Sequence, residues 1–274
     1  MAATEFAPAR FLQQGASQDQ HQEQDWRQKP ALLILNQPVA SIDLLQRLWA
    51  HTGYRLCADG GANRLYDTFD ALDDADARRQ EFLPTIIHGD LDSLRDDVRA
   101  YYASHGIQIS RDPDQYSTDF GKAIKRINAA VPATPTPHSG SGGCGREVLI
   151  LCTLGGRVDQ GLGLLYEMLR IQNAHAGTRL WLFSESSVSF ILPPGEHRIA
   201  APVAGQSSPG FFTENVGILP AFGPATISTT GLEWDVTDWP TSVDGNVSTS
   251  NHVKGEFVTI KTDAKVLFTI ERAS

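Results

Sequence analysis

The chain has 274 residues, a formal net charge of −9 at pH 7, and 41% hydrophobic residues. That length favours two compact units, and that hydrophobic content excludes a disordered chain. The acidic balance and the lack of a long Lys/Arg run argue against nucleic acid or an anionic membrane as a partner. An anionic substrate stays open, because a metal ion can balance its charge.

The first residues are polar and rich in Gln. They lack the apolar segment of a secretory signal, and no run in the chain approaches the roughly 20 apolar residues that span a bilayer. The three cysteines form no C-x-x-C pair and suggest no disulfide framework. We therefore expect a disordered tail over residues 1–29 and a cytoplasmic protein with no membrane segment.

Residues 30–177 alternate between short apolar runs and helical patterns, which is typical of an α/β domain with a mostly parallel sheet. A charged surface insertion is expected at 70–80 and a flexible linker at 131–145. The expected strands are 31–35, 54–58, 85–88, 107–110 and 147–153. The expected helices are 41–51, 62–69, a helix capped by Ser93, 118–130 and 159–174.

Beyond residue 177 the helical period disappears, and Gly and Pro separate short apolar segments. This pattern predicts an antiparallel β-sandwich domain over 178–274. The segment 179–184 is also compatible with the first sheet. The expected strands are 179–184, 188–192, 196–200, 217–220, 225–230, 257–261 and 266–271.

Polar segments follow four of the predicted parallel strands, at 59–64, 89–93, 112–119 and 155–160. Ligands of parallel α/β sheets bind at the carboxyl ends of the strands. Asp90 and Asp92 stand two apart on a turn, so both carboxylates can reach one Mg²⁺ ion. The alternative is that Asp92 or Ser93 merely caps the next helix. Asp59 and Asp119 on the same rim favour the metal site.

Glycines and basic residues in these segments suit phosphate binding. Gly60 and Gly156 allow close approach of the backbone, and Arg157 offers a planar cation. Lys122 and Arg64 are further cations. The alternatives are tight turns without a ligand and solvated basic side chains. No P-loop motif is present, and the G-x-G-x-x-G match at 140–145 precedes a strand instead of following one.

A second group of candidate binding residues lies near the C-terminus, in the segments 231–234 and 248–251. Trp234 can stack on a cationic ligand or fill a core, and composition alone favours the core.

Taken in order, these motifs resemble the thiamine pyrophosphokinase family, and 35–38 is similar to its eukaryotic branch. The likeness covers about residues 31–271. His88 and Tyr116 depart from the family's usual residues. The matching segments are Asp59-Gly60-Gly61-Ala62-Asn63-Arg64, Gly89-Asp90-Leu91-Asp92-Ser93, Asp114-Gln115-Tyr116-Ser117-Thr118-Asp119, Gly155-Gly156-Arg157-Val158-Asp159-Gln160, Gly231-Leu232-Glu233-Trp234 and Ser248-Thr249-Ser250-Asn251.

The resemblance implies a homodimer whose active sites lie at the subunit interface. It implies Mg²⁺-dependent transfer of the pyrophosphoryl group from ATP to thiamine, giving thiamine diphosphate and AMP. The expected metal ligands are Asp59, Asp90, Asp92 and Asp119, and the expected catalytic residues are Asp90, Asp92, Asp119 and Arg157. ATP is expected at Asp59, Gly60, Asn63, Arg64, Lys122, Gly156, Arg157, Asp159 and Gln160. Thiamine is expected at Gln115, Thr118, Trp234, Ser248, Ser250 and Asn251, with Trp234 supplied by the partner subunit.

Two other hypotheses fit the acidic residues. One is a metal-dependent phosphohydrolase that acts on a nucleotide, and the other is a thiamine or nucleotide sensor without turnover. Release of AMP only when thiamine is added separates the transferase from the hydrolase. Binding without AMP formation identifies the sensor.

Overall fold

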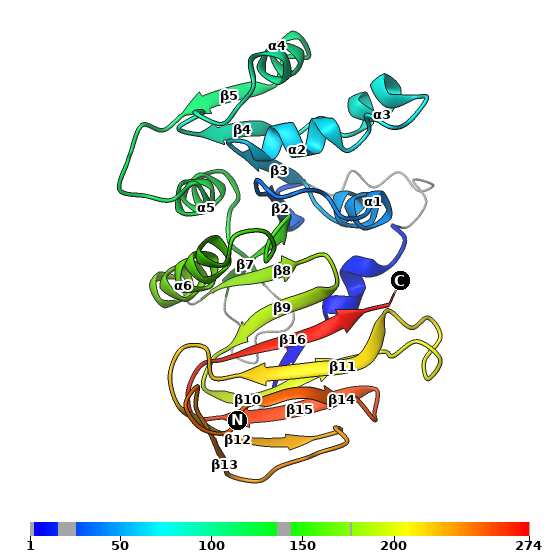
Figure 1. The fold of residues 1–274 in the computed structure, drawn as a ribbon, viewed down its shortest axis with the longest axis vertical. Coiled ribbons are helices and arrows are strands. Elements are labelled where there is room, and N and C mark those ends of the chain that lie inside the picture. Colours follow the sequence, from blue (N-terminus) through cyan, green and yellow to red (C-terminus); the bar gives the residue numbers. More distant parts are fainter. Residues whose placement is uncertain (1–2, 16–25, 136–143, 176, 274) are drawn as a thin grey trace.

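The computed structural model describes residues 3–15, 26–135, 144–175 and 177–273 (Figure 1). Its larger sheet has 11 strands. The main path of that sheet is β14 (Ser248–His252), β11 (Phe212–Leu219), β16 (Val266–Arg272), β9 (Ser187–Leu192), β8 (Thr178–Phe183), β7 (Cys144–Leu151), β2 (Ala31–Ile34), β3 (Tyr54–Ala58), β4 (Ile86–Gly89) and β5 (Gln108–Arg111), and β6 (Thr134–Pro135) pairs with β7.

The smaller sheet lies beneath one end of the larger one (Figure 1). It has the order β1 (Thr4–Phe6), β10 (Gly195–Ala200), β15 (Phe257–Thr262), β12 (Ala225–Thr230) and β13 (Trp239–Thr241). The helices are α1 (Ile42–Ala50), α2 (Gly61–Asp67), α3 (Ala75–Glu81), α4 (Asp96–Ser104), α5 (Asp119–Ala130) and α6 (Val158–Ala174), with 3-10 turns η1 (Pro8–Leu12) and η2 (Trp26–Gln28).

The predicted fold class is confirmed. From β5 to β8 the neighbours in the larger sheet are parallel, and from β8 to β14 they are antiparallel. Strand β8 pairs with β7 in parallel and with β9 in antiparallel fashion, so it joins the two halves. The α/β part and the antiparallel part therefore share one continuous hydrogen-bonded sheet.

Both faces of the parallel part are covered by helices, which explains its uninterrupted apolar strands. Leu33 and Leu56 pack with α5 and α6 on one face. Leu32 and Cys57 point the other way, into the cluster that contains α1, α2 and α4. That second cluster continues between the two sheets, so one core supports the parallel strands and the sandwich.

Several predicted boundaries shift for local reasons. Helix α4 begins at Asp96 with Arg95 as its N-cap, so the expected cap at Ser93 is wrong. The segment expected as a charged insertion contains α3. Strands β13 and β14 were not predicted, because β14 is polar and mostly solvent-facing and so lacks hydrophobic alternation.

The expected disordered tail is wrong for the described residues 3–15 and 26–29, while residues 16–25 lie outside the described part. Strand β1 pairs in parallel with β10. Phe6 is 3% exposed, stacks on Phe190 at a centroid distance of 5.0 Å, and has the Arg179 guanidinium 4.1 Å from its ring centroid. Phe6 and Phe11 are isolated aromatic residues in a polar segment, so they give no periodic signal. Their ring partner Trp181 lies far along the sequence.

The expected linker at 131–145 is only partly described, since residues 136–143 lie outside the described part. At its ends, β6 pairs with the first residues of β7.

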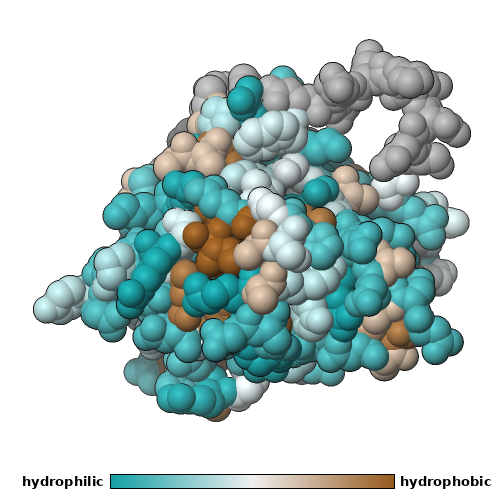
Figure 2. Space-filling model, turned by 90° about the horizontal axis from the view of Figure 1, so that it is seen from above, coloured by the Kyte–Doolittle hydropathy of each residue, from teal (hydrophilic) through white to brown (hydrophobic). Residues whose placement is uncertain are grey.

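The end of the molecule that carries β5 and α4 has a largely hydrophilic surface with one compact apolar patch (Figure 2). No helix among the described residues combines the length and apolarity needed to cross a bilayer.

The buried N-terminal contact yields a stability prediction. Phe6→Ala should lower the free energy of unfolding by about 3 kcal/mol or more, because it removes a buried ring and leaves a cavity. Phe257→Ala, at a ring that is 38% exposed, should cost less than half as much. Chemical denaturation measures both values, and equal losses would mean that residues 3–12 are not part of the core.

Candidate active site

Three carboxylates meet at the carboxyl edge of the parallel strands. Asp59 directly follows β3, Asp90 directly follows β4, and Asp119 is the first residue of α5. One oxygen of each lies within 4.8 Å of the others. Because β3 and β4 are neighbouring parallel strands, their ends bring the first two acids together. The structure thus confirms that these three predicted residues share one rim.

The backbone around the cluster is held in an unusual conformation. Asp59, Leu91 and Cys152 each follow a parallel strand and have positive φ angles of 43°, 68° and 62°. Such angles are costly for residues other than glycine, and they concentrate at functional sites. Asp59 is 3% exposed, and its carboxylate accepts hydrogen bonds from the Ser93 backbone N–H at 3.1 and 3.3 Å.

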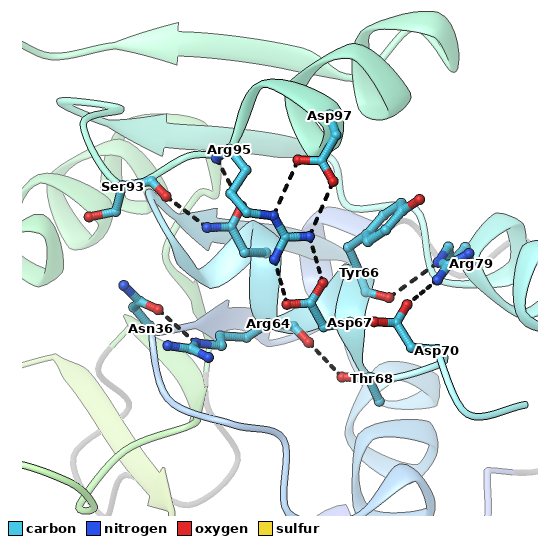
Figure 3. Close-up of polar contacts among 11 residues, drawn as sticks. Asn36, Arg64, Tyr66, Asp67, Thr68, Asp70, Arg79, Ser93, Arg95 and Asp97 are labelled. Carbon is cyan, nitrogen blue, oxygen red and sulfur yellow. Dashed lines mark hydrogen bonds and ion pairs between the residues drawn. The ribbon is translucent and has the colours of Figure 1, made fainter.

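Asn63 stabilises the loop that supplies this N–H group, which is the loop that carries Ser93 and Arg95 in Figure 3. Its amide donates to the Ser93 carbonyl oxygen at 2.7 Å, and its oxygen accepts from the Arg95 N–H at 3.1 Å. The Arg95 guanidinium in turn bonds both oxygens of Asp67 at 2.7 Å. Asn63, a predicted ATP contact, therefore fixes the loop between β4 and α4 through its amide.

Lys122 is the cation of the cluster. Its side chain is 2% exposed, and its Nζ lies 3.1 Å from Asp90 Oδ2 and 3.7 Å from Asp119 Oδ1. Burial alone raises the pKa of Asp90, but the hydrogen bonds from Lys122 and the Asp92 N–H outweigh it and lower that pKa. Burial works against the charge of Lys122 as well, yet Asp90 and Asp119 raise its pKa. Both groups are therefore charged at neutral pH.

Asp119 has the opposite character. Burial raises its pKa, and repulsion from Asp90 and Asp59 raises it further. Its Oδ1 is buried without a hydrogen-bond partner, although the side chain as a whole is 39% exposed. A buried oxygen that lacks a hydrogen bond and faces two more carboxylates is the arrangement that a hard divalent cation satisfies. Asp59, Asp90 and Asp119 therefore fit Mg²⁺.

Asp92 lies outside this group. It is exposed, and only its backbone takes part in the cluster, through an N–H that donates to Asp90 Oδ1 at 3.3 Å. Its carboxylate is absent from the described set of oxygens within 4.8 Å, so the expected fourth metal ligand does not join the other three here. Leu91, between the two acids, has a positive φ of 68°, so the turn departs from the extended geometry that would put both side chains on one face.

A cavity of about 360 Å³ opens beside Asp119. The predicted residues Thr118, Asp159 and Gln160 line it. Thr118 also caps α5 by accepting the Gly121 N–H at 3.1 Å. Four lining residues with hydrogen-bonding side chains were missed as site residues: Asn36, Gln37, Thr153 and Glu167. Three of them follow β2 and β7 closely, so the same strand-end rule applied to every strand would have found them.

The other predicted phosphate contacts are not directed at the acids. The Arg157 side chain is 75% exposed, and its Nη2 and Nε donate hydrogen bonds to the two carboxylate oxygens of Asp159 at 2.7 and 3.1 Å. Arg64 donates to Asn36 Oδ1 at 2.8 Å. A Cβ at Gly60 would approach the Asn36 amide to 2.4 Å, so this glycine allows close packing of two loops. Gly156, at φ 69°, lies against Gln37 in the same way.

The two departures from the resemblance differ in burial. His88 is buried behind the acids and hydrogen-bonds the Ser110 carbonyl oxygen through Nδ1 at 3.1 Å. Tyr116 is fully exposed beside Gln115 in the loop before α5.

The C-terminal group forms a second surface around Trp234, which is 56% exposed. Asn251 clamps the backbone of Trp234: its oxygen accepts the Trp234 N–H at 3.2 Å, and its amide donates to the Trp234 carbonyl oxygen at 3.0 Å. Ser248 and Ser250 lie on the same strand, β14. Trp234 is therefore not a core residue, and Asn251 positions it.

These two surfaces are far apart in one chain. Strand β14 forms one edge of the larger sheet, and seven strand spacings separate it from β3. At about 4.8 Å per spacing, this places β14 roughly 34 Å from Asp59. One group, at the parallel strands, contains the acids with Gln115 and Thr118. The other group, at β14 and the loop between β12 and β13, contains Trp234, Ser248, Ser250 and Asn251.

An acidic, lysine-containing site at the carboxyl edge of a parallel sheet, beside an antiparallel sandwich, defines an α/β-type enzyme. Residues 45–182 match the family model described as "Thiamin pyrophosphokinase, catalytic domain", and residues 196–267 match "Thiamin pyrophosphokinase, vitamin B1 binding domain". The chain belongs to the thiamine pyrophosphokinase family.

Individual relatives agree with this assignment. Thiamine pyrophosphokinase 1 of Arabidopsis thaliana is 36% identical, with 88% of this chain and 85% of the relative covered. Thiamine pyrophosphokinase 2 of Oryza sativa subsp. japonica is 34% identical, with 88% and 86% covered. The solved structure of thiamin pyrophosphokinase from Candida albicans is 26% identical and superposes with a TM-score of 0.79 over 99% of this chain and 94% of that one.

The raised pKa of Asp119 predicts a conflict between stability and metal binding. A raised pKa in the folded state means that the ionised form lowers stability once the pH exceeds that pKa. Without metal at neutral pH, Asp119→Asn should raise the Tm by about 1–3 °C, and the gain should vanish below about pH 4. Adding Mg²⁺ should raise the Tm of the unmodified protein and not of the variant.

The matched control is Asp74→Asn, at an exposed aspartate before α3. It should change neither the Tm nor the response to Mg²⁺. A stabilisation by Mg²⁺ that survives in Asp119→Asn would contradict the metal assignment.

Proposed function

We propose that this protein catalyses Mg²⁺-dependent transfer of the pyrophosphoryl group from ATP to the hydroxyl group of thiamine, giving thiamine diphosphate and AMP. The observation that carries the proposal is the group of Asp59, Asp90 and Asp119 around the buried Lys122, next to a cavity of about 360 Å³. Membership of the family supplies the acceptor, because its relatives are named for thiamine.

In this reaction the thiamine hydroxyl oxygen bonds to the β-phosphorus of ATP. The bond from that phosphorus to the oxygen bridging the α-phosphorus breaks, AMP leaves, and the hydroxyl proton passes to a base. Most of the catalysis in such transfers comes from positioning and charge neutralisation. Mg²⁺, held by the three aspartates, would supply positive charge at the phosphate oxygens.

The chain's own groups have separable roles in this proposal. Lys122 keeps Asp90 ionised and places a fixed ammonium group where phosphate charge collects. Asp119 lines the cavity, so its position suits a proton acceptor as well as a metal ligand. Asp59 is held rigidly by the Ser93 N–H and so defines the geometry of the cation site.

We also propose that the working form is a homodimer in which Trp234 of one subunit completes the site of the other. The separation of roughly 34 Å between β14 and β3 prevents one chain from bringing Trp234 to its own acids. Helix α6, which lines the cavity, shows an exposed apolar stripe of Val158, Leu162 and Tyr166, which are 77%, 48% and 60% exposed. Such a stripe is typical of a protein–protein contact.

The proposal is tested first by incubating the purified protein with ATP, Mg²⁺ and thiamine and separating the products by chromatography. Thiamine diphosphate and AMP should form in equal amounts, and AMP should not form without thiamine. Thiamine monophosphate with ADP would show that another bond is broken, and AMP without thiamine would indicate a hydrolase.

Lys122→Gln tests the role of the buried cation. Loss of the charge should lower kcat at least 100-fold, a magnitude typical of removing one group that stabilises transition-state charge. Lys125→Gln, at an exposed lysine on the same helix, should leave kcat within about twofold, as surface changes usually do. Near-normal turnover in folded Lys122→Gln would exclude this lysine from the site.

Mixing two inactive variants tests the shared site. Asp90→Asn removes an acid and Trp234→Ala removes the ring, so each alone should be nearly inactive. After unfolding and refolding together, about half of the dimers should be mixed, and each should hold one intact site, restoring about a quarter of the activity. No recovery, with mixed dimers demonstrated, would mean that each site belongs to one chain.

A further inference from the structure

The indole of Trp234 projects from the surface of a loop whose backbone is fixed but whose side chain is not held by the same contacts. Asn251 binds the N–H and carbonyl groups of Trp234, which sets the position of its Cα. An exposed side chain on a fixed backbone still has three staggered χ1 wells open to it. A ring that must stack on a ligand therefore needs a further contact that selects one orientation.

His252 provides that contact. It lies on β14 next to Asn251, and its ring centroid is 5.2 Å from the indole centroid at an interplanar angle of 43°. Aromatic pairs at this distance attract each other beyond the area that they bury. The His252 backbone is also fixed, because its carbonyl oxygen accepts the Glu233 N–H at 2.8 Å and its N–H donates to Asn251 at 2.8 Å.

Glu233 holds the imidazole from the other side. Its Oε2 lies 2.6 Å from His252 Nδ1, and Lys254 Nζ lies 3.0 Å from the same oxygen. The hydrogen bond from His252 and then that from Lys254 lower the pKa of Glu233, so the carboxylate stays ionised and keeps both partners. Glu233, His252 and Trp234 thus form a continuous row at the edge of the sheet, with Lys254 anchoring its far end.

We propose that His252, held in place by Glu233, is a positioning residue that fixes the indole of Trp234 for stacking on the cationic ring of thiamine. The inference rests on the proposed function for the identity of the ligand. It goes beyond that function by assigning a role to two residues that touch neither the phosphates nor the acids. His252 acts only through Trp234, so it affects recognition of thiamine and not the handling of ATP.

The expected effect follows from the population of competent rings. If loss of the imidazole lets the indole distribute over three wells, the competent fraction falls to about one third and the apparent affinity falls about threefold. Loss of the ring-to-ring attraction extends this to about tenfold. KM for thiamine should rise by that factor, while kcat and the KM for ATP should stay within about twofold.

Steady-state kinetics of the full-length protein test the proposal with four variants. His252→Ala and Glu233→Ala should both raise KM for thiamine about 3- to 10-fold. Glu233→Gln keeps an oxygen that accepts the His252 hydrogen bond and should keep KM for thiamine near the wild-type value. The matched control is His105→Ala, which removes an exposed histidine whose ring lies 4.4 Å from that of Tyr101, at the end of α4, and it should change nothing. An unchanged KM for thiamine in His252→Ala would overturn the proposal. So would a fall in kcat or a rise in the KM for ATP as large as the rise in the KM for thiamine.

A measurement without substrate separates this inference from the proposed function. Acrylamide quenching of the Trp234 fluorescence, isolated by subtracting the same protein with Trp234→Phe, reports how freely the indole is reached. It should increase in His252→Ala and Glu233→Ala and stay near the wild-type value in Glu233→Gln, even in a protein that forms no thiamine diphosphate. Equal quenching in all of them would overturn the positioning role, whereas absent turnover with altered quenching would overturn only the proposed function.

Discussion

The site depends on keeping three negative charges close together in a folded chain. Repulsion among Asp59, Asp90 and Asp119 opposes folding, and the chain offsets it by several local devices. Lys122 neutralises part of this charge through Asp90 and Asp119, and the Ser93 N–H donates a hydrogen bond to Asp59. Asn63 and Arg95 then hold the loop that presents this N–H group. Much of the polar network on this side of the sheet therefore exists to support an arrangement that is unfavourable without a bound cation.

The parallel half of the fold was well predicted from the sequence, because strands buried on both faces leave uninterrupted apolar runs such as the one ending at Ile34. The strand-end rule then placed Asp59, Asp90 and Asp119 on one rim. It also grouped Asp92 with them, because spacing along a turn does not show which carboxylates face the same point. The internal contacts of Asn63 could not be predicted in the same way, because its amide meets backbone groups some 30 residues away along the chain.

Other features were out of reach because their partners come from distant parts of the sequence. Phe6 is buried by Trp181 and Phe190, which no local pattern links to the N-terminus. Strand β14 is polar, so only its pairing with β11 makes it a strand. Composition favoured a core position for Trp234, and the resemblance alone corrected this. The reciprocal bonds to Asn251 show how an exposed indole keeps a defined place.

The strand β8 has a consequence for how the enzyme responds to its surroundings. Because β8 is hydrogen-bonded to both halves, the Trp234 edge and the acids belong to opposite parts of one continuous sheet. If the partner subunit supplies that edge, alignment of the two substrates becomes a property of the assembly and not of the subunit fold. Specific activity would then decline on dilution while each chain stays folded, so protein concentration itself would act as a control on the reaction.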